Sequence, residues 1–234
     1  QMAKKRRTTE ASRFDKIIKE NLEKVLPRLM ALSGIQYDRK ENLPMIKLQS
    51  TIEREPDFGC LIFNGEYPKG AVFHSELETS VKALPKYDGR MLFYYGLYFQ
   101  KLRKEVLQTL YYLGAEEPKF RNRILHKNMN FNYGVIWVRD FPHTEFIQSN
   151  EPEEVVFSIL TDFQGKPAEE IIDEILKHLQ KLLGNTLALQ KFIAQLRILS
   201  QLRNLHVQTI KKSNSMLTMK GMSIEKDPLF HRDH

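Results

Sequence analysis

The sequence predicts an α/β protein, in which a mixed β-sheet with a crossover helix precedes a helical C-terminal region. Two observations predict the sheet. Short apolar or alternating segments, typical of strands, recur within the first 145 residues, and one segment of helical period separates two of them. A third observation predicts the helical region, because from residue 151 onward the patterning is helical throughout. We therefore expect two regions, residues 1–145 with a basic N-terminal arm and residues 146–234.

The chain is expected to begin with a helix and to continue as an antiparallel meander. Residues 12–32 carry apolar side chains at helical spacing, and Pro27 is expected to kink or end this helix. The next three segments are predicted strands, at 45–53, 58–63 and 71–79. Asn64-Gly65 is a turn signal between the last two, so these strands are expected to pair as antiparallel neighbours.

The second part of the predicted sheet has a helix between strands. The helix is predicted over residues 87–103, and the strands over residues 105–113 and 133–139. Because a helix that joins two neighbouring strands suggests a crossover, part of the sheet is expected to be parallel. The later elements are all predicted helices, at 151–163, 167–183 and 186–211.

Composition and charge describe a globular protein with a basic first region. The chain has 36 Lys and Arg against 29 Asp and Glu, and residues 1–145 hold 25 of the basic and 18 of the acidic residues, so the whole excess of +7 lies there. A basic surface attracts polyanions such as nucleic acid, although a charge of this size also serves solubility. Cys60 is the only cysteine, which excludes an intrachain disulfide and a Cys-based zinc site. We find no membrane span and no secretory signal, and we expect a cytoplasmic protein.

Three acidic residues are expected to meet at one end of the predicted meander. Glu76 and Glu78 share a face of the third strand, because side chains alternate along a strand. Counting back across the turn places Asp57 opposite Leu77, and a shift of one residue places it beside Glu76 or Glu78. Converging carboxylates favour a hard divalent cation, Mg²⁺ or Mn²⁺. The alternative, an edge strand whose charges prevent aggregation, stays open.

A set of short motifs, taken together, resembles a known family. In chain order they are Lys19-Glu20-Asn21-Leu22, Glu53-Arg54-Glu55-Pro56-Asp57-Phe58, His74-Ser75-Glu76-Leu77-Glu78-Thr79, Arg90-Met91 with Tyr94-Tyr95, Tyr111-Tyr112-Leu113-Gly114, Asn132-Tyr133 with Val138-Arg139-Asp140, Glu151-Pro152-Glu153-Glu154, Leu199-Ser200-Gln201-Leu202-Arg203-Asn204 and Asp227-Pro228-Leu229-Phe230. In their order and spacing they resemble the PD-(D/E)XK nuclease-family transposases, relatives of the recombination-promoting nucleases. The resemblance covers nearly the whole chain. It implies a restriction-endonuclease-like core, α–β–β–β–α–β, and Mg²⁺-dependent hydrolysis of phosphodiester bonds in DNA.

The resemblance also assigns roles to individual residues. Pro56-Asp57 matches the PD pair and Glu76 matches the second acid, which makes Asp57 and Glu76 the expected metal ligands. Glu20 matches a first-helix carboxylate that some members of the superfamily use near the metal.

The chain departs from the family pattern at one position. The Lys that follows the second acid by two residues is Glu78 here, which lacks the positive charge but can serve as a third ligand or as a base for water. Lys82 and Arg90 are the expected sources of the missing charge and the expected contacts to nucleic acid. Two main hypotheses follow, a DNA endonuclease and a catalytically inactive DNA-binding or interaction protein on the same scaffold. A third alternative is an RNA or nucleotide phosphodiesterase, because the metal chemistry does not distinguish the sugar. In each case the helical region is expected to pack on the core or to form a homodimer.

Overall fold

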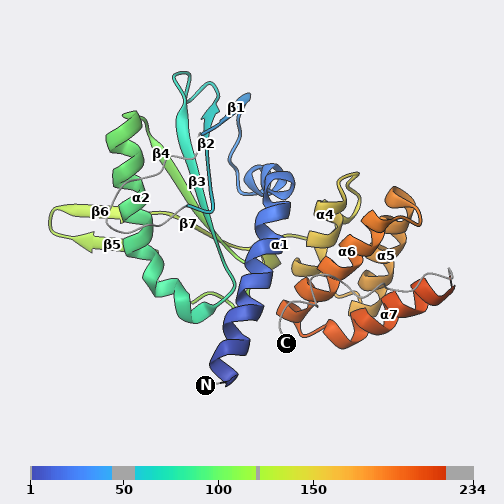
Figure 1. Ribbon diagram of the computed structural model, residues 1–234. Coiled ribbons are helices and arrows are strands. Elements are labelled where there is room, and N and C mark those ends of the chain that lie inside the picture. The colour runs from blue at the N-terminus through green and yellow to red at the C-terminus, as the bar shows by residue number, and fades with distance from the viewer. Residues whose placement is uncertain (1, 44–55, 120–121, 220–234) are drawn as a thin grey trace. The chain divides into compact units, whose positions relative to one another are not determined.

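The computed structural model describes residues 2–43, 56–119 and 122–219 (Figure 1). The described chain forms two compact units, one of residues 29–138 and one that combines residues 2–28 with 139–219. The first unit contains a mixed five-stranded sheet and the second is helical. The predicted α/β class, with a mixed sheet and a helical C-terminal region, is thus confirmed.

The first element is a long helix, α1, Met2–Leu32. Its apolar positions at helical spacing, such as Ile18, Leu26 and Leu29, are buried. The helix continues through Pro27 to Leu32, so an end at that proline, one of the two expectations, is wrong. The proline removes one backbone hydrogen bond, and the leucines on either side, Leu26 and Leu29, are buried.

The five-stranded sheet has the strand order β1-β2-β3-β4-β7. Its strands are β1 (Arg39–Asn42), β2 (Phe58–Phe63), β3 (Ala71–Glu78), β4 (Val106–Tyr112) and β7 (Gly134–Trp137). The strands β2 and β3 pair antiparallel, as predicted, and β1, which the sequence does not predict, pairs antiparallel with β2, whereas β3 with β4 and β4 with β7 are parallel. A parallel neighbour needs a crossover, and the helix α2, Tyr87–Leu102, connects β3 to β4 as expected.

Three strands differ from the sequence analysis. The strand predicted at residues 45–53 lies outside the described residues. The strand β1, which the sequence does not predict, lies earlier in the chain and contains no apolar side chain. The strands β5 (Arg123–His126) and β6 (Met129–Asn132) form a separate antiparallel hairpin that the sequence analysis does not predict.

The helix α2 covers one face of the sheet. Tyr94 and Tyr98 of α2 form a buried cluster with Val72 of β3 and Val106 of β4. The 3-10 helix η1, Val81–Lys86, leads from β3 into α2. Because side chains alternate along a strand, the even-numbered residues of β3 and β4 face this helix. The candidate site lies on that face.

The helical unit contains several short helices. These are α3 (Thr144–Ile147), α4 (Pro152–Phe157), α5 (Ala168–Leu183), α6 (Leu187–Leu199) and α7 (His206–Met219). The single helix predicted over residues 186–211 is therefore wrong. The 3-10 helix Ser200–Arg203 follows α6. The next residue, Asn204, has a left-handed backbone with a φ of 58°, so the helical path ends there before α7 begins.

Residues of α1 belong to the helical unit through polar contacts as well as apolar packing. Asn21 Nδ2 donates a buried hydrogen bond of 2.9 Å to Gln195 Oε1, and Arg28 Nε lies 3.0 Å from Glu154 Oε2. None of the helices in the described part of the chain is both long and apolar enough to cross a lipid bilayer.

Candidate functional site

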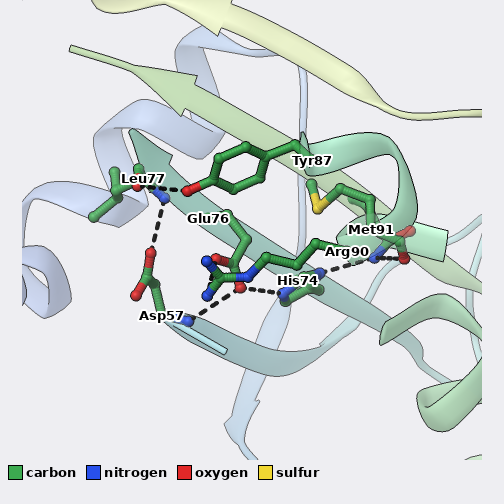
Figure 2. A network of polar contacts seen from close by, with 8 residues as sticks. Asp57, His74, Glu76, Leu77, Tyr87, Arg90 and Met91 are labelled. Atoms are coloured by element: carbon green, nitrogen blue, oxygen red, sulfur yellow. Dashed lines mark hydrogen bonds and ion pairs between the residues drawn. The ribbon is translucent and has the colours of Figure 1, made fainter. Parts of the chain in front are cut away.

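The pairing of β2 with β3 brings Asp57 beside Glu76. The register places Phe58 opposite Ser75, so that Asp57, one residue earlier, lies opposite Glu76. The backbone N–H of Asp57 donates to Glu76 Oε1 at 3.4 Å, and Asp57 Oδ2 accepts a hydrogen bond of 3.0 Å from the N–H of Leu77 (Figure 2). The register counted from the sequence places Asp57 opposite Leu77. The observed register is shifted from it by one residue, which is one of the two shifts that the sequence analysis considers.

Glu76 is completely buried and holds two charged or polar partners. Its Oε1 lies 3.1 Å from His74 Nε2, and its Oε2 lies 2.7 Å from a terminal guanidinium nitrogen of Arg90. Figure 2 shows the carboxylate between these two side chains. A buried carboxylate remains ionised only if hydrogen bonds and an opposite charge replace the water that it has lost. Arg90 and His74 provide this replacement.

The contacts of Gln108 determine where His74 carries its proton. Gln108 Nε2 lies 3.0 Å from the carbonyl oxygen of Met91, which can only accept, so this atom is an N–H donor. The same nitrogen lies 2.8 Å from His74 Nδ1, which must therefore be the acceptor. Burial, followed by the charge of Arg90, lowers the pKa of His74 to about 3. His74 is thus a neutral imidazole that donates from Nε2 to Glu76.

Arg90 is the positively charged group of this network. It lies in the first turns of α2, and its side chain is 26% exposed. Its guanidinium carbon lies 5.4 Å from the ring centre of Tyr87 and 5.8 Å from that of Tyr94, distances that favour cation–π attraction. Burial alone would lower the pKa of Arg90, but Glu76 and then Tyr87 outweigh burial and raise it. Arg90 therefore keeps its charge and neutralises Glu76.

Glu78 lies on the same face of β3 but binds a different set of donors. Its Oε1 accepts hydrogen bonds from the N–H groups of Thr79 at 2.7 Å and Ser80 at 2.6 Å. Its Oε2 accepts a hydrogen bond of 3.2 Å from the hydroxyl of Tyr87. Burial, then the charge of Glu78, raise the pKa of Tyr87 and keep this hydroxyl protonated. Glu78 therefore satisfies the backbone where β3 ends and η1 begins.

Two other predicted site residues, Glu20 and Lys82, are described by their own surroundings. Glu20 belongs to the helical unit, where its Oε2 lies 3.6 Å from Lys191 Nζ. Lys82 is exposed on η1. The roles that the sequence analysis assigns to Glu20 and Lys82 stay predictions.

The donor set can be compared with the needs of a divalent cation. Within the described residues, no group of three or more His, Cys, Asp or Glu side chains is arranged to hold a metal ion, so the expected meeting of three carboxylates is not found there. Mg²⁺, however, is usually held by one or two carboxylates and completes its shell with water and phosphate oxygens. Asp57 and Glu76, on neighbouring strands, fit that donor chemistry, on the condition that Arg90 releases Glu76.

Gln108 is the member of this network that sequence reasoning missed. It lies directly opposite His74 in the parallel pairing of β3 with β4, and it is buried in a strand of mainly apolar residues. A polar amide inside an apolar strand is the signal that could have found it, because buried polar groups are nearly always hydrogen-bonded.

Comparisons of the chain with protein-family models, with curated proteins and with solved structures find no match. The likeness to the PD-(D/E)XK nucleases thus stays a resemblance of short sequence motifs.

Proposed function

We propose that this protein is a metal-dependent DNA endonuclease whose centre is formed by Asp57 and Glu76. The observation that carries the proposal is the β2–β3 register, which places these two acids opposite each other at the end of the hairpin. The element order α1–β1–β2–β3–α2–β4 supports it, because this is the order that the resemblance to PD-(D/E)XK nucleases implies for a restriction-endonuclease-like core.

In this proposal each residue of the network has a separate task. Asp57 and Glu76 hold Mg²⁺ or Mn²⁺, which when bound polarises a phosphoryl oxygen and lowers the pKa of water. His74 fixes the orientation of the Glu76 carboxylate through its Nε2–H. Arg90, partly exposed beside the two acids, offers the positive charge that the family obtains from the Lys replaced here by Glu78.

The proposed substrate is DNA because the reaction acts on a polyanion and residues 1–145 are basic; the sheet unit, residues 29–138, holds 15 basic and 12 acidic residues of this region, a net charge of +3. All of the net charge of +7 resides in residues 1–145. One copy of the site cuts one strand of DNA. Cleavage of both strands of a duplex needs two symmetric sites, so the proposal includes a homodimer that supplies them.

A second candidate function is a DNA-binding protein without catalysis, and one observation favours it. Both oxygens of Glu76 are held by Arg90 and His74, and both oxygens of Glu78 are held by local donors. A site that has lost its chemistry can retain carboxylates that are held by ion pairs and hydrogen bonds of this kind.

Plasmid cleavage by matched variants separates the two candidates. Supercoiled plasmid is incubated with the protein and Mg²⁺ or Mn²⁺, and nicking is measured for the wild type, Asp57→Asn and Glu66→Gln. Asp57→Asn removes a charge but keeps an oxygen that can accept from Leu77, while Glu66, in the exposed turn at the other end of the β2–β3 hairpin, is the control. We expect Asp57→Asn to lose about 100-fold or more in rate and Glu66→Gln to cut like the wild type.

A different result would favour the second candidate. If the wild type shifts plasmid on a gel at low salt but never nicks it with either cation, the endonuclease proposal is wrong and the binding scaffold replaces it.

A further inference from the structure

We propose that Arg90 is an exchangeable counter-ion of Glu76, which a divalent cation must displace before the site can work. The inference deepens the proposed function and rests on it, since it concerns the same two carboxylates. It states that Arg90 and the metal ion are alternative partners of a single carboxylate oxygen.

A metal ion at Glu76 would compete with Arg90 for one carboxylate oxygen, Oε2. Oε1 already accepts from His74 Nε2 and from the backbone N–H of Asp57. Oε2 is the oxygen that Arg90 holds at 2.7 Å. A dication at Oε2 would be repelled by a guanidinium at the same atom, because like charges within about 4 Å cost several kcal/mol even at an effective dielectric constant of 20. Binding of the cation and departure of Arg90 are therefore linked.

Burial explains why a positive charge at Oε2 of Glu76 is favourable. The carboxylate is fully buried, and an isolated buried charge is strongly unfavourable. His74 cannot supply the charge, since it is a neutral donor fixed from behind by Gln108. Arg90 thus stabilises the site in the absence of a metal ion, and the metal ion can take over the same task.

Arg90 is also the member of the network that can move. Its side chain is 26% exposed, whereas those of His74 and Glu76 are fully buried. The rings of Tyr87 and Tyr94 lie against the guanidinium and would still bind it after it releases the carboxylate. Its Nε, which is buried, makes no hydrogen bond within the described residues, so no hydrogen bond of that atom would have to break when the side chain moves.

This exchange predicts that metal and DNA bind cooperatively. Metal binding frees the Arg90 guanidinium next to the two acids. A DNA phosphate that then pairs with this guanidinium makes the return of Arg90 to Glu76 less favourable. By linkage, DNA then raises the affinity for the cation by the same factor as the cation raises the affinity for DNA.

The test is Mn²⁺ binding to the protein without DNA, measured by electron paramagnetic resonance for the wild type, Arg90→Gln, Arg90→Lys and Asp57→Asn. Removal of the competing charge in Arg90→Gln is expected to tighten Mn²⁺ binding about 10-fold, within the usual range of coupling between two sites. Arg90→Lys keeps a competing charge and should stay within about threefold of the wild type, by the same reasoning. Asp57→Asn should bind weakly.

A second measurement needs only the folded wild type, in case Arg90→Gln does not fold. The side-chain Nε–H resonance of Arg90, assigned by its loss in Arg90→Lys, is followed by NMR while Mg²⁺ is added. We expect it to shift in step with metal binding.

The outcomes distinguish the two proposals. If the wild type binds Mn²⁺ but Arg90→Gln binds no better, or if Mg²⁺ binds without moving the Arg90 resonance, the exchange is wrong and the metal site stands. If neither the wild type nor Arg90→Gln binds a divalent cation, the proposed metal-dependent function fails, and the exchange fails with it.

Discussion

The ion pair of Glu76 with Arg90 should appear as a large coupling energy in a double-mutant cycle of Glu76→Gln, Arg90→Met and the double variant. Arg90→Met removes the positive charge that lies 2.7 Å from a fully buried carboxylate, a change that typically costs about 3–5 kcal/mol. Glu76→Gln leaves instead a guanidinium that is 26% exposed and solvated in part, so we reduce the expected cost to about 2–3 kcal/mol. The double variant has no stranded charge, and the coupling should be about 2 kcal/mol or more.

Urea unfolding of the four proteins measures this cycle, with Arg39 and Glu41 as the control pair. These two side chains lie 3.2 Å apart on β1 and are largely exposed, so no measurable coupling is expected between them. The reasoning would be refuted if the effects of Glu76→Gln and Arg90→Met added to within about 0.5 kcal/mol, the limit for independent sites. It would also be refuted if Glu76→Gln were the more damaging change, because burial assigns the larger penalty to the stranded carboxylate.

Three further predictions concern residues around the site. Gly59→Ala should lower the free energy of unfolding by about 1–3 kcal/mol in urea, because its Cβ would lie 2.6 Å from the hydroxyl of the buried Tyr98; an unchanged stability would show that the ring can give way. Burial raises the pKa of Cys60 from 9.0 to about 11. At pH 8 the thiol of the native protein should therefore react with Ellman's reagent about 100-fold more slowly than the thiol of the urea-unfolded chain. An equally fast reaction of the native protein would contradict this. Glu78→Ala should lower the free energy of unfolding by about 1–2 kcal/mol, because two backbone N–H groups lose their acceptor. Mn²⁺ binding should stay unchanged in this variant. A loss of Mn²⁺ binding would identify Glu78 as a ligand.

The strands that the sequence predicts are those that bury apolar runs. The strands β2, β3, β4 and β7 follow from this pattern, and so does the crossover helix α2. By contrast, β1 has the sequence Arg-Lys-Glu-Asn and forms at the edge of the sheet through backbone pairing with β2, which no side-chain pattern reports. The turn of the β5–β6 hairpin, Lys127-Asn128, likewise lacks the glycine that usually marks a tight turn.

The site was predictable only where it depends on local spacing. Alternation along β3 and the length of the hairpin bring Asp57 near Glu76, and the sequence analysis allows for that register. The partners of Glu76 depend on contacts between β3, β4 and α2, and neither the Arg90 ion pair nor the Gln108–His74 hydrogen bond follows from spacing within one element. The path of Glu78 toward Thr79 depends on how the chain turns after β3, which alternation does not describe.

The separation of Asn21 from Gln195 has a consequence for the order of events during synthesis. The two residues bond in the folded helical unit but lie 174 positions apart in sequence. At roughly 5–20 residues per second, a ribosome needs roughly 9–35 s to progress from one to the other. The sheet unit, which is continuous in sequence from residue 29 to 138, can fold within that interval, while the apolar stripe of α1 waits for α6. Nascent α1 therefore exposes its apolar stripe until α6 has been synthesised, and slow translation after residue 138 would prolong that exposure.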